Sequence, residues 1–111
     1  PPTHGATVVA TVLSNPNLRA TWEAELAEMR VRIKAMRSGL RDALKAQGVT
    51  QNFEHIVSQR GMFSYSGLSE SQVNRLRDEF AIYAVGTGRI CMAAINDKNL
   101  PHIASSIAKV L

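Results

Sequence analysis

The chain has a single cysteine, Cys91, and it lacks any uninterrupted run of about 18 apolar residues, the length that a membrane-spanning helix needs. One cysteine cannot form an intramolecular disulfide, which favours a reducing, cytoplasmic location. Aromatic residues are scarce as well, with one tryptophan, two tyrosines and three phenylalanines. The composition therefore predicts a single globular unit with a core of aliphatic and methionine side chains, and no membrane partner.

A strong charge of one sign is also missing, because the 111 residues contain 13 Lys and Arg against 9 Asp and Glu. The basic residues of the most basic stretch are Arg30, Arg32, Lys34, Arg37 and Arg41, and they are mixed with the acidic Glu23, Glu25, Glu28 and Asp42. A groove that binds phosphates needs clustered like charges. We interpret this stretch as a solvated helix face and expect no nucleic-acid partner.

Residues that could form a metal site or a nucleophile are equally sparse. His4, His55 and His102 are far apart in the sequence and stand in no cluster with metal-ligand spacing, so we expect no metal. Cys91 lies between Ile90 and Met92 and is interpreted as a small hydrophobic residue of a strand.

The first half of the chain has helical periodicity. Residues 1–14 form an apolar run of helical length, and Asn15 or Asn17 can cap the helix that follows. Apolar residues then recur in steps of three or four up to Leu44, which predicts one long amphipathic helix over residues 15–47. Gly48 is a natural stop for this helix, and Gly39 inside it indicates a bend or a close contact.

The second half, residues 48–111, alternates between short strands and helices. Ser69 and Gln72 have the spacing of a capping box, which starts a short helix ending near Phe80. The other predicted elements are strands around Phe53–Val57, Met62–Ser66, Ile82–Val85 and Ile90–Ala93, and a last helix, capped by Asn96 or Asp97, that runs to Leu111. The order of elements predicts an α/β fold, with a small α+β domain after the long helix.

The most unusual residue is Arg89, which follows a Gly-Thr-Gly turn and precedes an uncharged run. A guanidinium at the start of a strand offers two parallel donors that match a carboxylate. Phe63, on a neighbouring predicted strand, could form a wall of the same pocket. The residues alone leave an alternative open, in which Arg89 pairs with an internal acid such as Glu79 or Asp78 and Phe63 only fills the core.

Several segments together resemble one known family along essentially the whole chain. They are PPTHGA, LRATWEAELAEMRVRIKAMR, GMFSYSGLS, QVNRLRDEFAIYAV and GTGRICMAA, in order. The chain resembles the C-terminal portion of bacterial aspartate and aromatic amino acid aminotransferases, which are pyridoxal-phosphate enzymes of fold type I. The segments MFSYSGLS and GRICMA are more similar to the aromatic, or tyrosine, branch of this family.

The resemblance implies that Arg89 binds the α-carboxylate of the substrate and that Phe63 lines the substrate pocket. It further implies that residues 1–14 are an entry helix, 15–47 a connecting helix and 48–111 the small domain of a cytoplasmic homodimer. The substrates implied are aromatic amino acids, with aspartate as a further candidate, and 2-oxoglutarate.

By the same resemblance, the residues that bind pyridoxal 5'-phosphate are expected outside this segment. None of Lys34, Lys45, Lys98 and Lys109 is assigned to catalysis, so the segment alone should be inactive. The alternative of another class is a stand-alone helical binding or interaction module.

Overall fold

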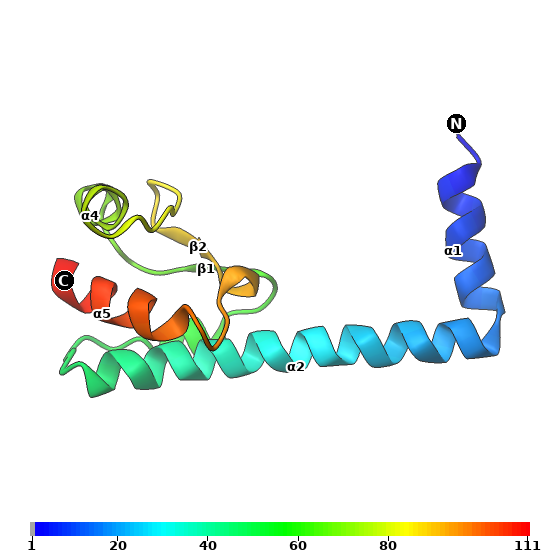
Figure 1. The fold of residues 1–111 in the computed structure, drawn as a ribbon, viewed down its shortest axis with the longest axis horizontal. Helices are drawn as coiled ribbons and strands as arrows, with labels where there is room; N and C mark the ends of the chain where they lie inside the picture. Colours follow the sequence, from blue (N-terminus) through cyan, green and yellow to red (C-terminus); the bar gives the residue numbers. More distant parts are fainter. Residues whose placement is uncertain (1) are drawn as a thin grey trace. The chain divides into compact units, whose positions relative to one another are not determined.

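The computed structural model describes residues 2–111 (Figure 1). The chain divides into two compact units, the first ending at Arg32 and the second comprising Ile33–Leu111. No helix of the described residues combines the length and the apolar character needed to cross a membrane.

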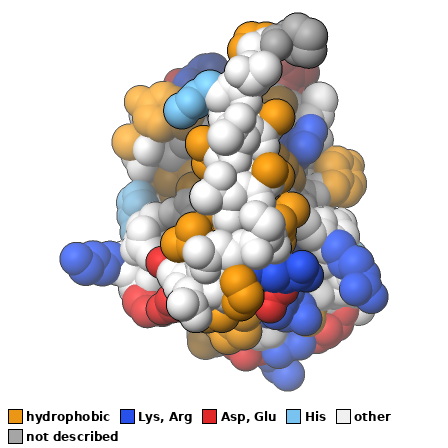
Figure 2. Space-filling view, turned by 90° about the vertical axis from the view of Figure 1, so that its right-hand side faces the viewer, with side chains coloured by type: hydrophobic (Ala, Val, Ile, Leu, Met, Phe, Trp, Pro, Cys, Tyr) orange, Lys and Arg blue, Asp and Glu red, His pale blue; other side chains and the backbone are white. Residues whose placement is uncertain are grey.

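The first unit consists of α1 (His4–Ser14) and the first half of α2 (Pro16–Ala46). Asn15 caps α2, because its side-chain oxygen accepts hydrogen bonds from the backbone N–H groups of Asn17 and Leu18 at 3.0 and 3.2 Å. Both helices were predicted from the sequence, and Asn15 was one of the two caps predicted, the other being Asn17. The hydrophobic side chains that α1 itself carries lie on the surface, as Figure 2 shows, and α1 has no buried residue.

The second unit contains the hydrophobic core. It is formed by the second half of α2 with α3 (Glu54–Ser58), β1 (Phe63–Tyr65), α4 (Glu70–Phe80), β2 (Arg89–Cys91), η1 (Met92–Ala94) and α5 (Leu100–Val110). The largest fully buried apolar side chains are Leu40, Leu44, Ile56, Leu76 and Met92. They come from four different elements, so burial of these side chains joins α2, α3, α4 and η1 into one body.

Two helices of this unit have the local features that the sequence predicted. Ser69 and Gln72 form the capping box at the start of α4. The Gln72 side chain also donates a hydrogen bond to the Val110 carbonyl at 3.1 Å, which ties α4 to the end of α5. Gly39 marks a close contact, because a Cβ built at this position would lie 3.0 Å from the Leu100 side chain.

Within residues 2–111 the sheet has two strands, β1 and β2, which pair antiparallel. In register, Phe63 lies opposite Cys91, Ser64 opposite Ile90 and Tyr65 opposite Arg89. Within β1 the side chains alternate, so that Ser64 is buried while Phe63 and Tyr65 are exposed. Phe63, Tyr65 and Arg89 therefore share the outer face of the sheet.

The strand predicted around Phe53–Val57 is wrong, because this segment forms the short helix α3. Phe53 and Ile56 are both buried, and a spacing of three residues matches one helical turn. The Asn52 side chain accepts a hydrogen bond from the Glu54 N–H at 2.8 Å and so starts that turn.

The strand predicted at Ile82–Val85 is also wrong. Only Val85 pairs, through an isolated bridge to Arg89, and residues 82–84 have no strand beside them in the described part of the chain. The predicted strand at Ile90–Ala93 extends only to Cys91, where η1 begins.

The predicted cap of the last helix is wrong. The N-cap of α5 is Asn99, and neither Asn96 nor Asp97 holds that position. The Asn96 side chain instead accepts hydrogen bonds from the Lys98 and Asn99 N–H groups, at 3.0 and 3.1 Å, and forms the turn before the helix.

Candidate functional site

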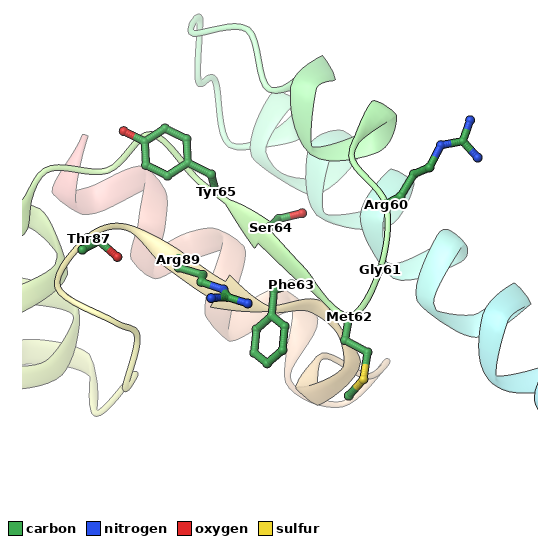
Figure 3. Close-up of a pocket in the computed structure, with 8 residues that line it drawn as sticks. All are labelled: Arg60, Gly61, Met62, Phe63, Ser64, Tyr65, Thr87 and Arg89. Carbon is green, nitrogen blue, oxygen red and sulfur yellow. The ribbon is translucent and has the colours of Figure 1, made fainter.

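Arg89 and Phe63 lie together, as the sequence predicted. The guanidinium carbon of Arg89 is 4.3 Å from the centroid of the Phe63 ring, which is a cation–π contact. The strand register explains this contact, because Phe63 lies two residues along β1 from the position opposite Arg89, within the diagonal reach of a long side chain. Figure 3 shows the two side chains next to each other.

An open hollow of about 520 Å³ surrounds this pair. The residues that line it are Arg60, Gly61, Met62, Phe63, Ser64, Tyr65, Thr87 and Arg89. None of them is acidic, and two are arginines, so the hollow favours an anion. Figure 3 shows that the side chains of Arg60 and Tyr65 point away from the Arg89–Phe63 pair. Arg89 is therefore the cation best placed to meet a ligand beside the ring.

The alternative of an internal ion pair for Arg89 is wrong for the two acids considered. Glu79 pairs with Arg75 at 2.7 Å, and Asp78 pairs with Arg77 at 2.8 Å. The hydrogen bonds from these arginines lower the pKa of both carboxyl groups. Within residues 2–111 no carboxylate forms an ion pair with Arg89, whose guanidinium is free to bind an external one.

The backbone at Arg89 is held by hydrogen bonds from Ser66, the residue after β1, and from the loop that precedes Arg89. Both the N–H and the hydroxyl of Ser66 donate to the Gly88 carbonyl, at 2.8 and 2.6 Å. The Val85 N–H donates to the Arg89 carbonyl at 3.1 Å. Gly88 has a φ of 83°, a conformation that glycine adopts without strain. The tight turn predicted before Arg89 is thus present, and it places the start of β2.

Arg37 is a second notable arginine, and the sequence analysis misassigned it to the solvated face of the long helix. Its exposed fraction is only 3%, and burial lowers the pKa of its guanidinium. Its position offered a signal, since Arg37 comes four residues after Ile33 and three before Leu40, on the apolar stripe. Arg41, one turn later, is more exposed and pairs with Asp42 and Glu54.

Within the described part of the chain, the guanidinium of Arg37 donates to uncharged oxygens only. One terminal nitrogen donates to the Ile56 carbonyl at 2.7 Å and to the Ser64 hydroxyl. The other donates to the carbonyls of Gly61 and Phe63, at 2.7 and 3.1 Å. Arg37 thereby connects α2 to the segment that carries Phe63.

The lysines lie away from the hollow. All four are exposed and none lines it: Lys34, Lys45, Lys98 and Lys109. No group of three or more His, Cys, Asp or Glu residues that could hold a metal occurs within residues 2–111. The hollow can bind and orient an anion, and that is the chemistry these side chains provide.

Comparison with known proteins gives consistent results along the chain. A family-wide sequence profile described as aminotransferase class I and II matches residues 2–107. An aspartate aminotransferase of Pseudomonas aeruginosa is 57% identical over all 111 residues, and an aromatic-amino-acid aminotransferase of Escherichia coli is 48% identical over the same length. In both cases the chain spans 28% of the relative's length.

Solved structures agree with this similarity. The crystal structure of an aromatic-amino-acid aminotransferase from Burkholderia pseudomallei, covalently bound to pyridoxal phosphate, superposes with a TM-score of 0.98 at 61% identity. The match covers 100% of this chain and 28% of that one. The predicted fold class, a long helix followed by a small sheet flanked by helices, is therefore confirmed, and it is the fold of the matched part of that enzyme, although the sheet has two strands where four were predicted.

Proposed function

The chain belongs to the class I and II aminotransferase family, and on this basis we propose that it is the C-terminal segment of a pyridoxal-phosphate-dependent aminotransferase. The complete enzyme moves an amino group between an amino acid and a 2-oxo acid. Residues 1–14 are the entry helix, 15–47 the connecting helix and 48–111 the small domain of this enzyme.

In this proposal Arg89 binds the α-carboxylate of both substrates. The observation that carries the assignment is the unpaired guanidinium of Arg89, which lies against the Phe63 ring in a hollow without acidic residues. An arginine binds a carboxylate through two parallel hydrogen bonds, which fix its orientation as well as its position. Phe63 forms the apolar wall beside the bound carboxylate and limits the water around the ion pair.

We assign aromatic amino acids as the amino donors, aspartate as a further candidate and 2-oxoglutarate as the acceptor. The relatives include enzymes named for aspartate and for aromatic amino acids, and the α-carboxylate that Arg89 would bind is common to all three substrates. The GMFSYSGLS segment, which contains Phe63, resembles the aromatic branch of the family.

The cofactor and the second subunit would complete the active site. The relative from Burkholderia pseudomallei is described as covalently bound to pyridoxal phosphate, and we propose the same cofactor for the complete enzyme. We expect its binding groups outside this segment, as the family resemblance implies. We further propose a cytoplasmic homodimer, as the family resemblance implies.

Replacement of Arg89 by lysine in the full-length enzyme tests the proposal. Arg89→Lys keeps the charge but removes the planar fork, so we expect kcat/KM to fall by roughly 30-fold to nearly 1,000-fold, a cost of about 2 to 4 kcal/mol. The loss should be similar for an aromatic amino acid, aspartate and 2-oxoglutarate. Arg77→Lys, on the exposed surface of α4, is the matched control.

Kinetics and thermal stability together distinguish a substrate-binding role of Arg89 from a purely structural one. If Arg89 has only a structural role, the variant will lose thermal stability while kcat/KM for all three substrates stays within about twofold of wild type, a difference of about 0.4 kcal/mol. That result would overturn the assignment of Arg89.

A further inference from the structure

Filling the space beside α2 does not by itself require a buried charge such as that of Arg37. A guanidinium loses its hydration when it is buried, and the described structure provides no carboxylate to compensate, only three carbonyls and one hydroxyl. An apolar side chain of similar length would fit the same stripe of α2 without that cost. The hydrogen bonds of Arg37 are therefore the feature to explain.

These hydrogen bonds converge on one short segment. Three of the four acceptors belong to Gly61, Phe63 and Ser64, which carry the wall of the hollow. Ser64 is buried, with an exposed fraction of 2%, and its side chain lies on the inner face of β1, opposite Phe63. Arg37 thus holds β1 from behind, while the outer face of the same strand presents Phe63 to Arg89.

The constraint extends from β1 to the guanidinium of Arg89. One path is the strand pairing, in which Tyr65 lies opposite Arg89 and Ser66 donates twice to the Gly88 carbonyl. The other path is the Phe63 ring, 4.3 Å from the guanidinium carbon. A shift of about 1 Å in a group that binds substrate can lower a rate by about 10²-fold, so small movements of β1 are significant.

We propose that Arg37 is a positioning residue for the carboxylate site. Arg37 fixes the position of β1 and, through β1, the orientation of the Arg89 guanidinium. It does so without contacting the substrate, since Arg37 is not among the residues that line the hollow. The inference rests on the proposed function of Arg89. It adds that the geometry of the site depends on a hydrogen-bonding group of the long helix.

The test uses the full-length enzyme with its cofactor and three variants. Arg37→Lys retains the charge but cannot reach all four oxygens with a fork, and Arg37→Met removes every donor. Ser64→Ala removes one acceptor and is the mildest change, so it remains informative if Arg37→Met fails to fold. Arg41→Lys is the matched control, because Arg41 also connects α2 to α3, and its ion pairs are with Asp42 and Glu54 and not with residues of β1.

We expect Arg37→Lys to lower kcat/KM by about tenfold and Ser64→Ala by about threefold, with most of the change in KM. Arg41→Lys should stay within about twofold. A structural role alone would lower the melting temperature of the Arg37 variants and leave the kinetics of the folded enzyme normal, and that result would overturn the inference.

A double-mutant cycle gives the decisive measurement. If Arg37 acts by aiming the Arg89 fork, Arg37→Lys should cost less than about threefold when Arg89 is already lysine. An equal loss in both backgrounds would overturn the positioning role. The proposed function fails separately, if Arg89→Lys alone leaves kcat/KM normal, and in that case the inference fails with it. If kcat/KM is normal for Arg37→Lys but lowered for Arg89→Lys, the inference about Arg37 is refuted and the proposed function of Arg89 stands.

Discussion

Gly88 lies so close to the backbone of Leu68 that a Cβ built on it would stand 2.6 Å from the Leu68 carbonyl oxygen. The same Cβ would approach the Ser66 hydroxyl oxygen at 3.4 Å. The contact joins the loop before β2 to the segment that follows β1. Because Gly88 directly precedes Arg89, the closeness of these two chain segments sets where β2 begins.

Gly88→Ala in the full-length protein should be strongly destabilising. The new methyl group has no space against a backbone oxygen, and alanine at positive φ costs a further 1 to 2 kcal/mol or so, which gives a total of about 3 kcal/mol. Gly48→Ala is the matched control, because Gly48 also has a positive φ, 81°, but a Cβ built on it would meet nothing within 4 Å. Thermal unfolding of both variants should show a clearly larger drop for Gly88→Ala, and equal drops would contradict the contact.

Phe63→Leu should weaken the binding of the carboxylate. The substitution keeps an apolar side chain but removes the ring face beside Arg89, and a cation–π contact at an exposed site is worth about 1 kcal/mol, or roughly fivefold in kcat/KM. Phe63→Tyr retains the ring and should remain within about twofold. Steady-state kinetics of both variants with the same 2-oxo acid acceptor would test this prediction. Equal losses of kcat/KM in Phe63→Leu and Phe63→Tyr would argue against a role for the ring.

The 111-residue chain by itself should self-associate through the first unit. Leu18, Trp22, Leu26 and Met29 recur in steps of three or four on α2, and each is 43% to 56% exposed. Trp22→Glu should reduce the association, whereas Ala24→Glu adds the same charge about 200° around the helix and should not. Sedimentation at several concentrations measures the effect. A monodisperse monomer at high concentration would refute the prediction.

The isolated chain should also be inert towards the cofactor. Its four lysines are exposed and lie outside the hollow, so pyridoxal phosphate should form only weak imines with them, without a saturable absorbance change and without transamination. Absorbance titration of the isolated chain beside the full-length enzyme provides the comparison. Measurable turnover by the isolated chain would show that this account of its residues is wrong.

Local sequence patterns determined the longer helices, α1, α2, α4 and α5, and the most prominent residue of the site. The steps of three and four residues up to Leu44 predicted the helix found as α2, and the Ser69–Gln72 spacing predicted the cap of α4. These features depend on neighbours within one or two turns, which the sequence displays directly. Arg89 was recognisable because a lone charge beside an uncharged run needs an anionic partner, from the protein or from a ligand, and Phe63 followed from a nearby predicted strand.

The tertiary structure decided which segments find partners. The segment at Ile82–Val85 has strand-forming residues but only one bridging residue, and α3 replaced an expected strand because Phe53 and Ile56 face the same core. In the sequence Arg37 resembles the other charges of the helix surface. Its hydrogen-bond acceptors, which are oxygens of α3 and β1, come from residues 19 to 27 positions away. Strand pairing and the burial of a charge both depend on groups distant in sequence, so only the assembled fold determines them.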